Sequence, residues 1–244
     1  MSAATVAENL PEFFAEAPTL TVHDPLAQFL GAAEQGTMTY HYADAVRLAG
    51  HSCPTVAGTW LMVIAGLRAL YGDGELPVRG EIQVFLADAS DSGATGVIAT
   101  VAQLLTGAAS ETGFQGIGGR FSRQNLLSYG QAMRGVLGLR RMDTGRAVQV
   151  SLDASVVPWH DEMRTVMPLA ASGRASAEQL QRFGELWQDR VRKMLTEHAS
   201  DSQMISVIDW PDALDTGYMR SKMAAMPWPP PMHMVTRAYW PWMR

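Results

Sequence analysis

The chain has 244 residues and a formal net charge of −5, and 47% of its residues are hydrophobic. It is long enough to bury a sizeable core, and its composition is that of an ordinary globular protein. The acidic balance argues against broad nucleic-acid binding, because that function needs clustered Lys and Arg to neutralise phosphates. The single cysteine excludes an internal disulfide bond and is compatible with a reducing cytoplasm.

No segment has the pattern of a secretory signal or a membrane helix. Residues 1–14 carry two glutamates and neither lysine nor arginine, so they lack the basic start of a signal peptide. The longest apolar run lies near Trp60 and is interrupted by Gly66 and Arg68, short of the roughly 18 residues that a membrane helix needs. We therefore predict a cytoplasmic protein without a membrane partner.

The first 36 residues are predicted to form a leader and a short helix. Two prolines interrupt residues 1–22, which we expect to pack late or not at all. The pair Asp24-Pro25 is typical of a helix start and predicts a helix over residues 26–31. Its inner side is expected to consist of Leu26, Phe29 and Leu30.

Residues 37–209 alternate between strand and helix patterns. Apolar residues at spacings of three and four predict the main helix at 55–71, and its small residues Gly58 and Gly66 would let another segment come close. Strands are expected at 37–41, 81–87 and 204–209, with a hairpin formed by 131–141 and 146–153. Further helices are expected at 42–48, 94–105, 159–169 and 176–198.

The composition changes at Trp210. Residues 210–244 contain six prolines among tryptophans and methionines, so they cannot form one regular helix. The aromatic content is too large to be left wholly exposed to water. We expect this tail to wrap over its own domain or over a second copy of the chain.

The most informative motif is Gly50-His51-Ser52-Cys53-Pro54. Proline fits the first turn of a helix, which places Cys53 at or next to the N-cap. Free N–H groups and the helix dipole favour a thiolate at that position. A thiolate with an imidazole two residues away is typical of a metal site or an activated nucleophile. The alternative is a buried cysteine that serves only as a small apolar side chain.

A zinc site at this motif needs more ligands than the motif holds. Zinc takes four ligands in tetrahedral geometry, and at least three usually come from protein. Besides His51 and Cys53, we predict His41 as a metal ligand, because it ends the strand that leads into the motif. The remaining candidates are the imidazoles of His23 and His160 and the carboxylates of Asp88 and Asp91.

Three stretches together resemble the family of the E subunit of formylmethanofuran dehydrogenase over about residues 38–155. The first is the His-x-Cys-Pro motif running into an apolar helix. The second spans residues 87–107, where Asp91-Ser92 precedes a helix that ends in Thr-Gly. The third begins with Gln-Asn-Leu-Leu-Ser-Tyr-Gly at 124–130 and continues through Asp-Thr-Gly-Arg at 143–146 to a strand.

The resemblance implies an α+β fold with a largely antiparallel sheet packed against helices, usually in a dimer. It implies a metal site, typically zinc, that uses His51 and Cys53. The chain departs from the family at Ala49, Gly93 and Ala108, where members often have ligating residue types, and it lacks the C-terminal cysteine-rich finger. This chain therefore has fewer candidate metal ligands than members of the family often have.

These inferences divide the chain into a leader (1–36), an α+β domain (37–209) and a tail (210–244). The predicted function is that of a zinc-binding homodimer, with a metal-dependent or redox reaction on a small molecule as one possibility. One alternative is a haem protein that uses Cys53 or a histidine as axial ligand, with the aromatic tail closing the pocket. Others are a metal-free cysteine enzyme with His51 as base, and a non-catalytic component of a larger complex whose tail docks a partner.

Overall fold

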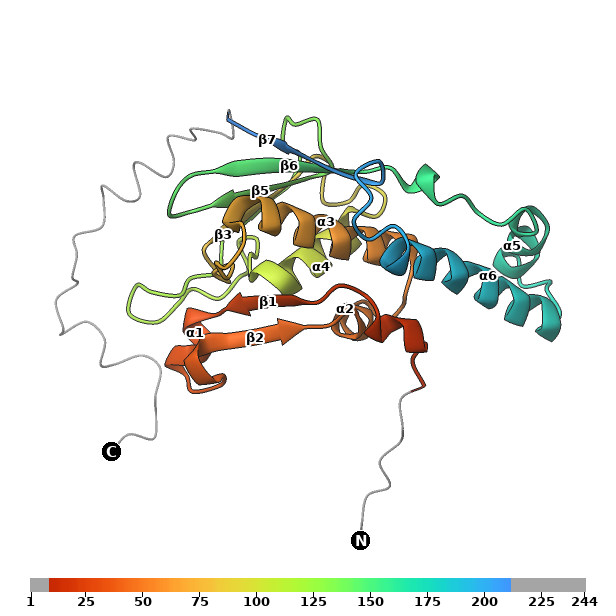
Figure 1. The fold of residues 1–244 in the computed structure, drawn as a ribbon, viewed down its shortest axis with the longest axis horizontal. Coiled ribbons are helices and arrows are strands. Elements are labelled where there is room, and N and C mark those ends of the chain that lie inside the picture. The colour runs from red at the N-terminus through yellow and green to blue at the C-terminus, as the bar shows by residue number, and fades with distance from the viewer. Residues whose placement is uncertain (1–8, 212–244) are drawn as a thin grey trace, which may run out of the picture.

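The structure is a computed structural model that describes residues 9–211 (Figure 1). Residues 1–8 and 212–244 lie outside the described part, and with them lies almost all of the tail expected at 210–244. Of that tail, Trp210 is buried and packs edge-to-face on Phe85, with 5.4 Å between the ring centroids.

The described chain is built in three layers (Figure 1). A five-stranded sheet forms one outer layer, and the helices α3 (Pro54–Tyr71) and α4 (Thr95–Thr106) form the middle one. A two-stranded antiparallel sheet of β1 (Leu20–His23) and β2 (Thr37–Tyr40) forms the other outer layer. Because α3 has the five-stranded sheet on one side and the helices α2 (Tyr42–Ala49), α4 and α6 (Ala177–Thr196) on others, it needs apolar residues around its whole circumference.

The five-stranded sheet has the order β4-β3-β5-β6-β7. Strands β3 and β4 are parallel, and each of the other neighbouring pairs in this sheet is antiparallel. This confirms the predicted α+β class, with a largely antiparallel sheet packed against helices. The hairpin of β5 and β6 is also confirmed, although its first strand begins at 137 and not at 131. The strands are β3 (Ile82–Leu86), β4 (Leu127–Ser128), β5 (Leu137–Arg141), β6 (Ala147–Leu152) and β7 (Ile205–Asp209).

Helix α3 is the centre of the core. Its predicted apolar face is buried, and so are residues on its other sides, among them Thr59, Leu61 and Met62. The close approach expected at its glycines is also present. A methyl group added at Gly66 would lie 2.7 Å from Cδ1 of Leu139, and one at Gly58 would overlap a side chain of β6. The sheet therefore packs on α3 at a distance that excludes even one extra methyl group.

The remaining α-helices match the predicted ones in number and order. Ser176 opens α6 as expected, since its Oγ accepts a hydrogen bond from the N–H of Gln179. Helix α4 (Thr95–Thr106) starts one residue later than predicted, with Ala94 as its N-cap and without a side-chain capping hydrogen bond. The helices are α1 (Pro25–Phe29), α2 (Tyr42–Ala49), α5 (Met163–Ala171) and α6 (Ala177–Thr196), with 3-10 turns η1 (Glu12–Ala15), η2 (Glu34–Gly36) and η3 (Ala154–Val156).

The expectation that residues 1–22 pack late or not at all is wrong for their described part. Phe14 and Leu20 are buried in the main core, and Nε1 of Trp60 donates a hydrogen bond to the carbonyl of Pro18 at 2.8 Å. Strand β1 pairs with β2, across the predicted division at residue 36. Residues from about 10 onward therefore belong to the same packed body as the helices.

The predicted inner side of α1 is also wrong. Phe29 and Leu30 are 55% and 60% exposed, and Ala27 is the buried residue of this helix. Phe29 packs against Phe121, with 5.1 Å between the ring centroids, so its contact is with a neighbouring loop on the surface. One helical turn is too short for spacing alone to define its buried side.

Asp24 holds a buried ion-pair network. Its carboxylate caps α1 by accepting hydrogen bonds from the N–H groups of Leu26 and Ala27. It also accepts hydrogen bonds from Arg79 at 2.8 Å and from Arg123 at 2.7 Å. Burial raises the pKa of Asp24, but these donors and the two positive charges outweigh it and lower the pKa below its usual 3.8. The network ties the N-terminal layer to segments about 55 and 99 residues away.

None of the helices within residues 9–211 has the length and apolar character needed to span a lipid bilayer. Two helices, α5 and α6, extend beyond the layered body as an arm at the right of Figure 1.

Replacing Gly66 by alanine is expected to destabilise the protein by about 1–3 kcal/mol, because the added methyl group meets Leu139 and Val150. Gly184→Ala in α6 is the matched control, since an added methyl group there has nothing within 4 Å. This control is expected to stabilise by roughly 0.5–1 kcal/mol through its higher helix propensity. Urea denaturation measures both changes. Equal stabilisation by the two variants would contradict the packing at α3.

The stability of the protein is expected to fall steeply with pH in the acid range. The pKa of Asp24 is lower in the folded state than the 3.8 of an unperturbed aspartate, so its stabilising contribution is present above that value. The contribution is lost as the pH falls through the lower folded-state pKa. Urea denaturation measures the free energy of unfolding between pH 7 and pH 3. Asp24→Asn should be less stable than wild type at pH 7, and its free energy of unfolding should fall less as the pH is lowered. Asp91→Asn, at an exposed carboxylate, is the control. An unchanged pH profile in Asp24→Asn would refute this role.

Candidate metal half-site

The His-x-Cys motif lies at the junction between α2 and α3. Gly50 ends α2 in the left-handed conformation, with φ of 74°, and its N–H donates a hydrogen bond to the carbonyl of Val46. A glycine adopts this conformation without strain. Pro54 begins α3 shortly after it. His51, Ser52 and Cys53 therefore occupy a short linker between two helices, each of which fixes one end of it.

Cys53 is the N-cap of α3, as the sequence predicts. It is in the extended conformation, and its Sγ accepts a hydrogen bond from the N–H of Val56 at 3.4 Å. The residue is 9% exposed and belongs to the main core, so it also fills space as a small apolar side chain would. The two interpretations of Cys53 therefore describe the same position: a packed residue whose sulfur points at the start of a long helix.

His51 is exposed, and the junction itself orients its ring. Nδ1 lies 2.9 Å from the carbonyl oxygen of Ala49. A carbonyl oxygen can only accept a hydrogen bond, so Nδ1 carries the proton and Nε2 of the neutral ring presents a lone pair. Metal-ligating histidines are oriented in this way, with one ring nitrogen donating to a carbonyl and the other free to bind the metal.

Hydrogen bonds of Ser52 to two neighbouring helices hold the linker in place. The hydroxyl of Ser52 lies 3.0 Å from the hydroxyl of Tyr42, which is fully buried. Its carbonyl accepts two hydrogen bonds at 3.1 Å, from Nε1 of Trp187 and from Nε2 of Gln188 on α6. The sequence does not identify these three partners. Nothing in the sequence indicates that a donor 135 residues further along the chain binds this carbonyl.

The structure does not bring His41 to the motif. His41 precedes α2, whereas His51 follows it, and a helix of eight residues is about 12 Å long. The N–H of His41 instead donates a hydrogen bond to the carboxylate of Asp44 at 2.8 Å. His23 lies in β1 with Nδ1 at 3.1 Å from the carbonyl of Gln35.

The other candidate ligands are also dispersed. Asp88 and Asp91 are exposed in the loop between β3 and α4. His160 precedes α5, and its Nδ1 accepts a hydrogen bond from the N–H of Glu162. Among residues 9–211 no group of three or more His, Cys, Asp and Glu side chains could hold a metal ion. Within residues 9–211 the candidates that stay close in the chain are His51 and Cys53, which are fewer than the ligands that a zinc site needs.

Comparisons with known proteins add a distant likeness of fold. The sequence matches no known protein family and no curated protein. Among solved structures, the fold is similar to a protein from Syntrophus aciditrophicus described as like the E subunit (FmdE) of a tungsten formylmethanofuran dehydrogenase, at 17% sequence identity and a TM-score of 0.41. The match covers 74% of this chain and 76% of that one. This is a weak fold resemblance, and membership of the family stays a prediction.

The haem alternative and the docking alternative both depend on the tail. Residues 212–244 lie outside the described part of the chain. Haem binding, closure of a pocket by the tail and docking of a partner through it therefore stay predictions, as does the role of His51 as a base for Cys53.

The Ser52–Tyr42 hydrogen bond is expected to stabilise the junction. Ser52→Ala leaves the buried Tyr42 hydroxyl without its partner and should cost about 1–3 kcal/mol. The double variant Ser52→Ala/Tyr42→Phe removes both hydroxyls and should cost less than the sum of the two single changes. Urea denaturation of the four proteins measures the coupling energy. Strict additivity would show that the two hydroxyls do not interact.

Proposed function

We propose that the protein binds a divalent metal ion, zinc, between two copies of the chain. Each copy supplies the imidazole of His51 and the thiolate of Cys53. A two-fold axis repeats the same surface on both partners, so one pair of ligands becomes four. Two nitrogen and two sulfur ligands form one of the tetrahedral sets that structural zinc sites use.

The observation that carries this proposal is the orientation of His51. Its Nδ1 faces the carbonyl of Ala49 and its ring is exposed, so the lone pair on Nε2 is available outside the chain's own packing. The ring is oriented by rigid backbone at the end of α2, which lowers the entropy cost of binding a metal.

The position of Cys53 supports the pairing. Residues two apart on an extended segment lie on the same side of the backbone, and Cys53 is extended. Ser52, between the two residues, is held by its hydrogen bond to the hydroxyl of Tyr42. The N–H of Val56 already donates to Sγ, and a negatively charged sulfur is a stronger acceptor for that donor. In the proposed site the linker supplies two of the four ligands, and a single copy cannot complete the site.

A site of this kind is structural. When four protein ligands fill the tetrahedron, no position is open for water or substrate. Zinc would then stabilise the dimer, because the metal binds only when the two junctions face one another. The homodimer and the zinc are thus one proposal.

The test measures metal content and mass together on the full-length protein, purified without an affinity tag. Elemental analysis is expected to give about 0.5 zinc per chain, and light scattering the mass of a dimer. His51→Ala and Cys53→Ala should each lose most of the zinc and shift the protein toward the monomer.

The matched controls are His41→Ala and His160→Ala. Both histidines lie away from the junction, so both variants should keep the zinc and the dimer. Stoichiometric zinc in the double variant His51→Ala/Cys53→Ala would sink the proposal. So would a monomer that holds one zinc per chain, because that result requires a complete site within one copy.

A further inference from the structure

The arm carries a pocket that the metal half-site does not use. We call it the arm pocket; its volume is about 580 Å³ and it lies between η3, α5 and α6. This size is within the range that small-molecule sites occupy. The lining residues that matter for its chemistry are Trp159, His160, Met163, Arg164, Met167 and Arg190. Of the two arginines, Arg164 is exposed to solvent and pairs with Asp161 at 3.4 Å.

Arg190 is a buried cation at this pocket. Its residue is 9% exposed, and its guanidinium stacks on the ring of Trp159 at 4.1 Å. Nε donates a hydrogen bond to the carbonyl of Val157 at 2.7 Å, and Nη2 donates to the carbonyl of Ala154 at 2.6 Å. Burial lowers the pKa of Arg190, since no negative charge within the described residues offsets the loss of water. The two carbonyls hold the group in place without neutralising it.

The acidic residues near the pocket are paired with other groups. Glu162 pairs with Arg182 at 2.8 Å, and Asp189 with Lys193 at 2.7 Å. Nη1 of Arg190 donates to no atom of the described residues, although that nitrogen is not sealed from solvent. A buried charge is stable only when it is paired or fully hydrogen-bonded. Solvent reaches this nitrogen, and an anion in the pocket would displace water and accept its hydrogen bond.

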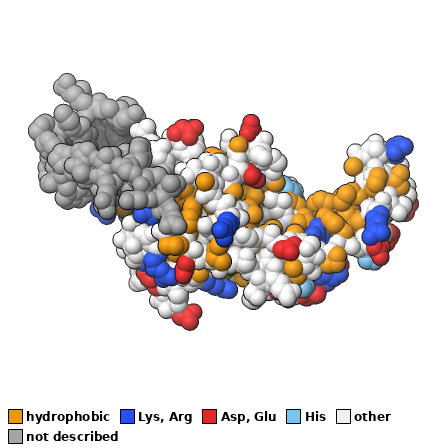
Figure 2. All heavy atoms as spheres, turned by 90° about the horizontal axis from the view of Figure 1, so that it is seen from above, with side chains coloured by type: hydrophobic (Ala, Val, Ile, Leu, Met, Phe, Trp, Pro, Cys, Tyr) orange, Lys and Arg blue, Asp and Glu red, His pale blue; other side chains and the backbone are white. Residues whose placement is uncertain are grey.

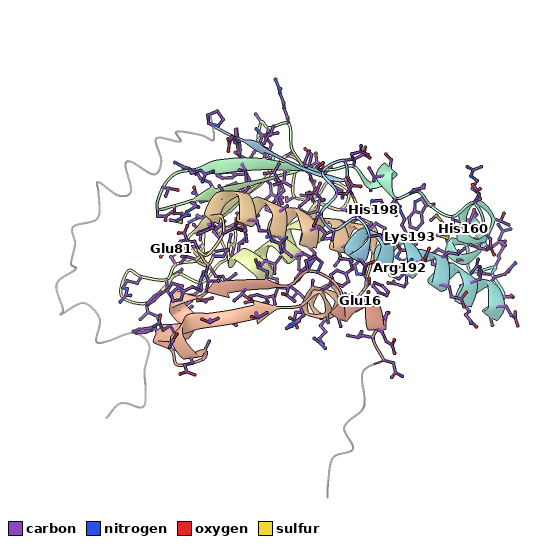
Figure 3. All side chains as sticks on the ribbon, viewed as in Figure 1. Glu16, Glu81, His160, Arg192, Lys193 and His198 are labelled. Atoms are coloured by element: carbon purple, nitrogen blue, oxygen red, sulfur yellow. The ribbon has the colours of Figure 1, made fainter. Side chains whose placement is uncertain are left out.

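His160 adds a second donor at the rim. Figure 3 shows this residue on the arm, at the start of α5. Its Nδ1 accepts the hydrogen bond from the N–H of Glu162, so Nε2 of the neutral ring carries the proton. Nε2 of His160 is thus a hydrogen-bond donor, whereas Nε2 of His51 presents a lone pair. A donor suits an anionic ligand and not a metal ion.

The rest of the lining is apolar. Trp159, Met163 and Met167 contribute an aromatic face and two flexible thioether chains, which adapt to varied apolar shapes. Figure 2 shows hydrophobic side chains gathered where this arm projects from the body. An inorganic anion such as phosphate would leave this wall uncovered. The lining fits a ligand with an apolar body and one negatively charged end.

We propose that the arm pocket binds a small amphipathic carboxylate. Its carboxylate accepts hydrogen bonds from Nη1 of Arg190 and Nε2 of His160, and its apolar body packs on Trp159, Met163 and Met167. The proposal does not rest on zinc, because no residue of the metal half-site lines the pocket.

Isothermal titration calorimetry of the full-length protein with decanoate tests this site, with decanol and decyltrimethylammonium as ligands of similar apolar length. Decanoate is expected to bind at one site per chain, about ten- to a hundred-fold more tightly than either. Arg190→Met should remove that preference for decanoate. Arg174→Met, at an exposed arginine after α5, should bind decanoate as wild type does.

The comparison among the three ligands needs only the wild-type protein, so it stands even if Arg190→Met fails to fold. Equal affinities for decanoate and decanol would overturn the proposal, and so would no binding of decanoate below its micellar concentration. Wild-type affinity for decanoate in a folded Arg190→Met variant would also overturn it. Light scattering reports whether the protein is a monomer or a dimer during the titration. If decanoate binds the monomer but not the dimer, a second copy fills the pocket, and that result would also overturn the proposal.

Discussion

Helix α3 is packed between the five-stranded sheet and the helices α2, α4 and α6, and the rest of the fold depends on how closely the sheet approaches it. At Gly66 an added methyl group would lie within 3.0 Å of side chains from both β5 and β6. Packing at that distance stabilises the interior but leaves no freedom for α3 to shift or rotate. Because the helix is fixed, its first residue is fixed as well. The position of Cys53 in space is therefore set by packing contacts along the whole length of α3.

The linker before α3 is held by contacts from two other helices. Tyr42 of α2 binds the Ser52 hydroxyl, and Trp187 and Gln188 of α6 bind its carbonyl. The ring of Trp187 also packs against Trp159, with 4.9 Å between centroids, and Trp159 lines the arm pocket. A ligand in the pocket and a metal at the junction would thus contact opposite ends of one chain of packed groups.

Much of the fold was predictable from sequence because its signals are local. The spacing in α3, the proline and glycine boundaries at the motif and the alternation in β6 each describe a few neighbouring residues. The predictions fail where tertiary contacts determine which residues are ordered and which are buried. Strand β1 has only four residues and becomes ordered by pairing with β2, and α1 is too short to define an inner side.

The candidate sites show the same division. The sequence placed Cys53 at the N-cap of a helix, because Pro54 and the apolar run after it are adjacent. His41 was grouped with the motif because it is close in sequence, but helix α2 lies between them and separates them in space. The sequence did not single out Arg190, since an arginine in an amphipathic helix is normally solvated. Its burial depends on carbonyls of residues 154 and 157, more than 30 positions earlier.

The central claim is that two copies of His51 and two of Cys53 surround one zinc ion. X-ray absorption spectroscopy at the zinc edge of the purified dimer tests it most directly. We predict two sulfur ligands at about 2.3 Å and two nitrogen ligands at about 2.0 Å. A first shell of nitrogen and oxygen alone, without sulfur, would contradict the claim.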